Sequence, residues 1–297
     1  MGSPQTAVRS AQHAGTWYPG DARILRESIE TYLSQTKPVS LPGQPIALVS
    51  PHPGHRFGGL VAAHAFIQVK GKPFSRVVLL GPLHRPIIGA LFSDLLVTSA
   101  SAYATPLGLV PVDRPFLEQL GRRVSLKEVR RDEEHSLEVE LPFLQVALGE
   151  FKLVPLMLGA DISEPDTLGP LSELASALAE LADEHTLFVS STDLSHLHNY
   201  TDVTMIDKQM QDLVNAFDLH RLTDALVHGD VFACGATGLI TALSAARLRG
   251  AKGARVLAYM NSGDVTGDTR PGNYTVGYMA AVAYGPSQVS DGTLSRP

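Results

Sequence analysis

Short runs of strand-forming apolar residues alternate with longer segments of helical periodicity along most of this chain. The pattern predicts strands at residues 46–50, 76–80, 95–98, 151–158, 187–190, 256–260 and 274–283. It predicts helices at residues 23–33, 58–67, 136–148, 168–181, 204–217 and 238–248, with a kink or a late start at Pro142. Strands that alternate with helices indicate an α/β fold with a mainly parallel or mixed central sheet flanked by helices.

The chain is expected to form one domain. Its 297 residues suit a single α/β unit, and no repeat of fixed period or linker rich in Pro, Gly or Ser divides it. With 44% hydrophobic and 18% charged residues, the sequence can bury a sizeable core. We expect the domain to span residues 4–285, followed by a loose tail over residues 286–297, where apolar periodicity is lost.

Charge and cysteine content narrow the classes of partner and compartment. The net charge is −6, and the densest basic stretch, residues 122–131, is interrupted by Glu128 and followed by acidic residues, which argues against nucleic acid. A single cysteine excludes an intrachain disulfide and fits a reducing compartment. No segment approaches the ~18 apolar residues of a membrane span, and the N-terminus lacks an apolar signal core. We therefore expect a cytoplasmic protein without a membrane partner.

Chemistry-bearing side chains follow three of the predicted strands. His52 follows the strand at 46–50, His84 follows the strand at 76–80, and the strand at 187–190 leads to Asp193 and His196. Ligands of open α/β sheets bind outside the carboxyl ends of the strands. Imidazole is also the commonest metal ligand in proteins. The sequence therefore predicts a metal site assembled from distant segments.

Each of these residues also has a purely structural interpretation. His52 could be a loop histidine bonded to backbone, and the nearby His55 is expected to be a bystander. Arg85 would disfavour a cation at His84, unless it points away or binds an anionic substrate. The three-residue spacing of Asp193 and His196 would place both on one face of a helical turn. One could be a ligand and the other an acid or base, or they could be a helix cap and a surface histidine.

Two further residues are ambiguous from sequence. Carboxylates beside His135, at positions 132–134 and 138, would favour its imidazolium form and proton donation, although an acidic helix N-terminus explains them equally. Cys234 precedes the helix predicted at 238–248, where a thiolate would be stabilised. Most lone cysteines, however, are small buried hydrophobes.

Six short motifs occur in an order that resembles the Memo proteins, whose prokaryotic branch is called AmmeMemoRadiSam system protein B. They are HAGTWY at 13–18, PHPG at 51–54, LGPLH at 80–84, EHSLE at 134–138, SSTDLSH at 190–196 and CG at 234–235. The segments NSGD at 261–264 and GD at 267–268 also resemble the family. The resemblance covers about residues 8–285.

The resemblance implies a fold similar to that of class III extradiol ring-cleavage dioxygenases, which use non-haem Fe(II). It implies that His52, His84 and Cys234 are the metal ligands, with Asp193 and His196 beside them. The ring-cleaving enzymes use two histidines and a carboxylate instead. A thiolate is softer, tolerates copper or zinc, and can itself be oxidised.

These implications define a functional hypothesis with a rival. The protein is expected to be an Fe(II)-dependent extradiol dioxygenase acting on catechol-type aromatics and O2, with His196 as the acid/base, His135 as a second proton donor and Asp193 orienting a neighbour. Trp17 and Tyr18 could line the aromatic pocket or belong to the core. The rival is a non-catalytic metal-binding or partner-binding protein that keeps the pocket without turnover. The name of the prokaryotic branch also implies a radical-SAM partner.

Overall fold

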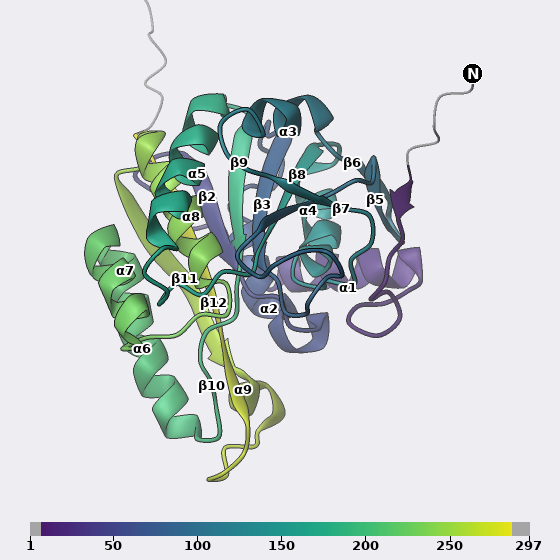
Figure 1. Cartoon of the computed structure of the whole chain (residues 1–297). Coiled ribbons are helices and arrows are strands. Elements are labelled where there is room, and N and C mark those ends of the chain that lie inside the picture. Colours follow the sequence, from purple (N-terminus) through teal and green to yellow (C-terminus); the bar gives the residue numbers. More distant parts are fainter. Residues whose placement is uncertain (1–6, 287–297) are drawn as a thin grey trace, which may run out of the picture.

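A mixed nine-stranded sheet runs through the computed structural model, which describes residues 7–286 (Figure 1). Its strands lie in the order β10 (His196–Leu197), β12 (Thr275–Tyr284), β2 (Pro45–Ser50), β9 (Thr186–Ser191), β3 (Arg76–Pro82), β8 (Lys152–Leu158), β4 (Leu95–Thr98) and β7 (Lys127–Val129), and β11 (Gly253–Asn261) pairs with β12. The central strands β2, β9, β3 and β8 are parallel, whereas β12 and β4 run antiparallel to β2 and β8. The predicted α/β class with a mixed sheet is confirmed.

A smaller sheet lies beside the main one. It has three strands, in the order β1 (Val8–Arg9), β5 (Ala102–Thr105) and β6 (Gly108–Pro111). Strand β1 is parallel to β5, and β5 is antiparallel to β6. This pairing fixes the start of the N-terminal segment against the middle of the chain.

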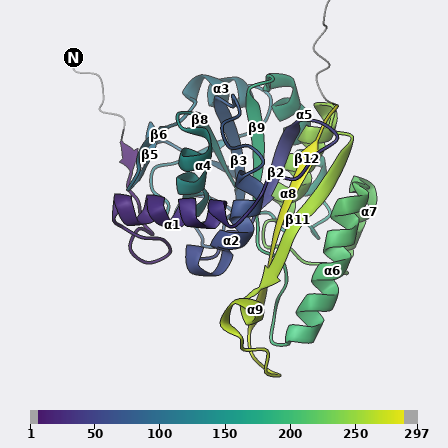
Figure 2. The ribbon, with the colours of Figure 1, turned by 180° about the vertical axis from the view of Figure 1, so that it is seen from behind.

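Helices cover both faces of the main sheet (Figures 1 and 2). They are α1 (Ala22–Ser34), α2 (His55–Phe66), α3 (Arg114–Leu120), α4 (Leu141–Leu148), α5 (Leu168–Leu181), α6 (Tyr200–Ala216), α7 (Leu219–His228), α8 (Ala236–Leu248) and α9 (Ser262–Thr266), with a short 3-10 helix at Glu138–Glu140. Helices α1, α2 and α4 pack together on one face, and α5 and α8 pack on the other. Helix α6 follows the long β11–β12 ribbon.

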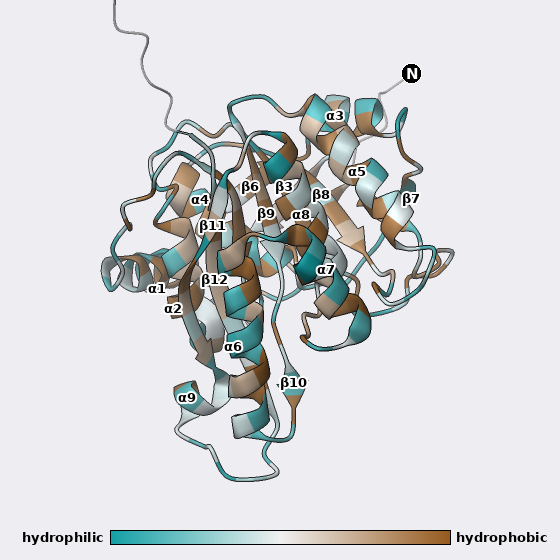
Figure 3. Ribbon diagram, turned by 90° about the vertical axis from the view of Figure 1, so that its left-hand side faces the viewer, coloured by the Kyte–Doolittle hydropathy of each residue, from teal (hydrophilic) through white to brown (hydrophobic). Residues whose placement is uncertain are grey.

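The core lies between the parallel strands and the two helical layers. In β3, Val77, Val78, Leu79 and Leu80 are all fully buried, as expected for a strand covered on both faces. The hydropathy colouring shows the same distribution, with apolar central strands and a polar stripe along α6 (Figure 3). Strand β3 ends at Gly81 and Pro82, and the candidate site lies just beyond this carboxyl end.

Several predicted boundaries shift. Helix α2 begins at His55 rather than at Gly58, and α6 begins at Tyr200 because the Asn199 side chain accepts hydrogen bonds from the first turn. The late start predicted at Pro142 is confirmed, since α4 begins at Leu141. The short strands β1, β5, β6, β7 and β10 and the helices α3, α7 and α9 were not predicted. Of the predicted tail, only Pro286 falls inside the described residues.

Within residues 7–286, the longest apolar helices are too short or too polar to cross a membrane.

Candidate metal centre

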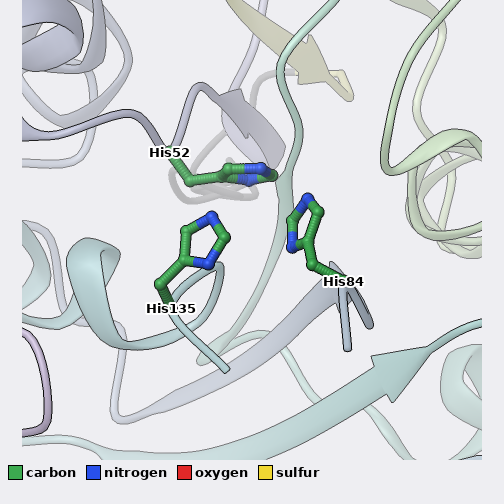
Figure 4. A group of neighbouring side chains, drawn as sticks. All are labelled: His52, His84 and His135. Carbon is green, nitrogen blue, oxygen red and sulfur yellow. The ribbon is translucent and has the colours of Figure 1, made fainter. Parts of the chain in front are cut away.

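Three imidazoles converge at the carboxyl end of the sheet. His52 follows β2, His84 follows β3, and His135 lies in the loop that leads to the 3-10 helix. One ring nitrogen from each lies within 4.8 Å of the others (Figure 4). The strand exits predicted the first two positions. The third residue was expected nearby only as a proton donor, and the structure places its ring inside the cluster.

The outward-facing ring nitrogens of all three histidines have partners. His52 Nδ1 lies 2.9 Å from Ser191 Oγ, and His84 Nδ1 lies 2.9 Å from Glu134 Oε1. His135 Nδ1 lies 3.2 Å from the same Glu134 oxygen. Ligating histidines characteristically donate their second ring N–H to a carboxylate or another acceptor, which fixes the tautomer. With Nδ1 engaged in this way, Nε2 is the ring nitrogen left to bind a metal, and in His52 it also lies 3.3 Å from the Cys234 thiol.

Glu134 anchors two of the imidazoles at once. Its carboxylate also accepts the backbone N–H groups of His84, His135 and Ser136. Burial alone would raise the pKa of Glu134, but the hydrogen bond and charge of His84 and the backbone donors outweigh burial and hold the pKa at about 2. Glu134 therefore carries a full negative charge next to the cluster. Nothing in the sequence sets Glu134 apart from the other carboxylates beside His135, although it opens the EHSLE motif.

The charge state of His135 depends on burial as well as on its acidic neighbours. Those carboxylates would favour the imidazolium form, or they could equally mark an acidic helix N-terminus. Burial instead lowers the pKa of His135 to about 4, and the nearby His84, His13 and Arg85 lower it further, while Glu134 opposes the shift. The ring is therefore neutral at physiological pH, as a metal ligand must be.

Cys234 lies beside His52, just before α8, and is not part of the three-imidazole cluster. Its Sγ atom is 3.3 Å from His52 Nε2 and accepts a hydrogen bond from the backbone N–H of Asp193 at 3.2 Å. The side chain is half-buried, and burial raises the pKa of the thiol. The thiol thus contacts the Nε2 atom of His52, and its role as a metal ligand stays a prediction.

Asp193 and His196 do not share a helical turn, because the chain between β9 and β10 has no helical residues. The buried Asp193 carboxylate accepts the backbone N–H of His52 at 2.9 Å. His196 begins β10, and its Nδ1 lies 2.8 Å from the carbonyl of Leu194. A ring nitrogen beside a carbonyl must carry the proton, so the Nε2 atom of His196 is left with a lone pair.

The histidines open into a cavity of about 820 Å3 that is also lined by Asp193, His196 and several aromatic rings. The Trp17 ring centroid lies 4.1 Å from that of His135. Tyr18 is 3% exposed and donates a 2.6 Å hydrogen bond to Glu138, so it both borders the cavity and belongs to the core. His55 also borders the cavity, but its Nε2 lies 2.9 Å from the carbonyl of Val139 and the residue is outside the three-imidazole cluster.

The donor atoms fit a transition metal. Imidazole nitrogens, with a thiol 3.3 Å from one of them, suit iron, copper or zinc, whereas magnesium and calcium prefer carboxylate and carbonyl oxygens. The fixed outer nitrogens also mean that little ordering of the rings remains to be done when a metal binds. An α/β fold with such a cluster at its strand ends defines a candidate metal-binding protein.

Comparison with known proteins identifies the family. The sequence matches the model of the Memo-like proteins over residues 9–282. A MEMO1 family protein of Thermotoga maritima is 34% identical over 287 residues, which cover 91% of this chain and 98% of the relative. A MEMO1 family protein of Aeropyrum pernix is 34% identical over 291 residues, covering 92% and 98%, and one of Methanobrevibacter smithii is 28% identical over 291 residues, covering 93% and 99%. The chain belongs to the Memo family.

Proposed function

We propose that this protein is an Fe(II)-dependent extradiol dioxygenase that cleaves catechol-type aromatics with O2. The observation that carries the metal-binding part is the convergence of His52, His84 and His135, each with its outer nitrogen close to a partner. Catechol chemistry is supported by the similarity of the family's fold to class III extradiol dioxygenases and by the aromatic cavity in front of the cluster.

His52 and His84 hold the iron in this proposal, together with Cys234. The thiol is the third ligand that the family resemblance implies, and it lies 3.3 Å from His52 Nε2. His135 completes the imidazole cluster, where its Nε2 can accept a hydrogen bond from bound substrate or replace the thiol as a ligand. Fe(II) supplies a centre that can take both oxygens of a catechol and activate O2.

The proton chemistry belongs to the chain's own side chains. His196 borders the cavity with a free Nε2 lone pair, so it accepts the phenolic proton and later returns it. Asp193 fixes the position of His52 through the backbone hydrogen bond. Trp17, whose ring lies against His135, forms a wall for the aromatic ring of the substrate.

The test is anaerobic loading with Fe(II), followed by a panel of catechols and air. We expect oxygen uptake together with a yellow ring-opened product, and loss of both in His196→Ala with iron still bound. If the protein binds iron but takes up no oxygen with any catechol of the panel, the proposed enzymatic activity is contradicted and the protein is a non-catalytic metal-binding protein. Tighter binding of zinc with no dependence on oxygen would point to hydrolysis instead.

A further inference from the structure

Arg85 is a cation at the mouth of the metal cavity without a carboxylate partner. It follows His84 directly and lines both the 820 Å3 cavity and an adjoining hollow of about 900 Å3. Its side chain is exposed, and no ion pair or hydrogen bond to it is found within residues 7–286. A guanidinium in this position is free to receive an anion.

The carboxylates around Arg85 are largely engaged elsewhere. Three of those that line the adjoining hollow have other partners. The pairs are Glu128 with Arg114 at 2.9 Å, Asp132 with Arg9 at 2.8 Å and Glu134 with His84 at 2.9 Å. Glu133 also lines both hollows, but it forms no ion pair with Arg85 in the described residues. Within the described residues, therefore, no carboxylate lies within ion-pair distance of Arg85, although Glu133 shares both hollows with it.

Arg56 supplies a second exposed cation on the same cavity. Its guanidinium lies 4.5 Å from the centre of the Phe57 ring, and it too has no ion pair in the described residues. The cavity volume of about 820 Å3 leaves room for substituents beyond a single catechol ring. Aromatic walls, an arginine beside a metal-binding histidine and spare volume together suit an aromatic acid.

We propose that the substrate is a catechol-type ring bearing a carboxylate and that Arg85 binds this carboxylate. The catechol part rests on the proposed function, whereas recognition of the carboxylate does not. A planar guanidinium can donate two parallel hydrogen bonds to a carboxylate, and it does so more strongly where water is partly excluded. The position of Arg85 next to His84 places the anionic end of the substrate beside the metal centre.

The single tryptophan of the chain, Trp17, gives a direct binding assay, because it borders the same cavity. Quenching of its fluorescence is titrated without oxygen, with and without Zn(II), using catechol and 3,4-dihydroxybenzoate. We expect the carboxylated ligand to bind about tenfold more tightly or better, consistent with a hydrogen-bonded charge pair, and added salt to reduce the difference. Arg85→Gln should abolish the preference without weakening catechol binding, and Arg85→Lys should retain part of it.

The matched control is Arg221→Gln, since Arg221 is exposed on α7 and borders neither hollow. Equal affinity for the two ligands, no quenching by 3,4-dihydroxybenzoate, or an unchanged preference in Arg85→Gln would overturn the proposal. If Arg56→Gln alone removes the preference, Arg85 is not the anion-binding residue. The binding assay involves no turnover, so the two proposals can fail separately. Tighter binding of 3,4-dihydroxybenzoate without oxygen uptake contradicts only the proposed dioxygenase activity. Oxygen uptake without tighter binding of 3,4-dihydroxybenzoate contradicts only the proposed carboxylate recognition.

Discussion

The two sides of the imidazole cluster are held by different chemistry. On one side, a single carboxylate, Glu134, contacts both His84 and His135. On the other side, His52 contacts the hydroxyl of Ser191, which itself donates to the carbonyl of Ser136 at 2.6 Å. One side therefore depends on a carboxylate charge shared by two rings. The other depends on a serine hydroxyl that serves one ring and also lies 3.1 Å from the buried Glu140 carboxyl group, which burial keeps in its neutral form by raising its pKa to about 8.

Exposure differs in the same way. His52 is 1% exposed, whereas the His84 side chain is 30% exposed. A buried ring that is bonded at Nδ1 and fixed at its backbone by Asp193 has few alternative rotamers. The exposed ring beside the cavity relies on Glu134 for its orientation. We infer that His52 is the fixed reference point of the site and that the Glu134 side is the adjustable one.

Removal of the fixed ring should have the largest effect. His52→Ala should weaken Zn(II) and Fe(II) binding by more than the about 10- to 100-fold expected for loss of an outer partner, because a ligand itself is lost. Competition with a chromophoric chelator measures this, and thermal unfolding checks that the variant is folded. His220→Ala is the control, since that side chain is 86% exposed on α7. Wild-type affinity in His52→Ala would mean that the cluster is not the metal site.

The third metal ligand beside His52 and His84 can be identified by comparing substitutions of Cys234 and His135. Cys234→Ala should lose metal affinity to a similar degree and should lose the near-ultraviolet thiolate absorption of the Co(II)-substituted protein. His135→Ala should keep that absorption and bind Co(II) within about tenfold of wild type. The opposite result would establish the three imidazoles as the ligand set.

Part of the site can be predicted from the sequence, and part of it cannot. Strands that end in His52 and His84 are visible as apolar runs, and parallel strands deliver their ends to one edge. The position of His135 is set by an irregular loop that Glu134 organises through backbone hydrogen bonds, and such loops leave no periodic signal. The charge state of His135 was left open for a related reason, because sequence reveals neighbouring carboxylates but not the burial that lowers the pKa of the ring.

Loss of the shared charge should have the next largest effect. Glu134→Gln keeps the shape of the side chain but removes the charge that orients both His84 and His135, so metal affinity should fall about 10- to 100-fold. Isothermal titration with Zn(II) measures the change. Glu133→Gln is a matched neighbour whose exposed carboxylate forms no ion pair within residues 7–286, and it should bind metal like wild type. If both variants lost the same metal affinity, Glu134 would act only through its negative charge near the cavity and not through its contacts with His84 and His135.

Substitution on the Ser191 side of the cluster should have the smallest effect on metal affinity. The neighbouring Ser190, on the same strand, provides a control. Ser191→Ala removes the acceptor of His52 Nδ1–H in a fully buried place, which should cost about 1–3 kcal/mol of unfolding free energy. Metal affinity should fall no more than about tenfold, because burial and the Asp193 contact still hold His52 in place. Ser190→Ala should be neutral or stabilising, since Ser190 Oγ is buried and has no hydrogen-bond partner in the described residues. Denaturant unfolding and Zn(II) titration of the two variants test the comparison. If Ser191→Ala lost as much affinity as Glu134→Gln, the neutral hydrogen bonds would matter as much as the carboxylate, and the adjustable side could not be assigned to Glu134.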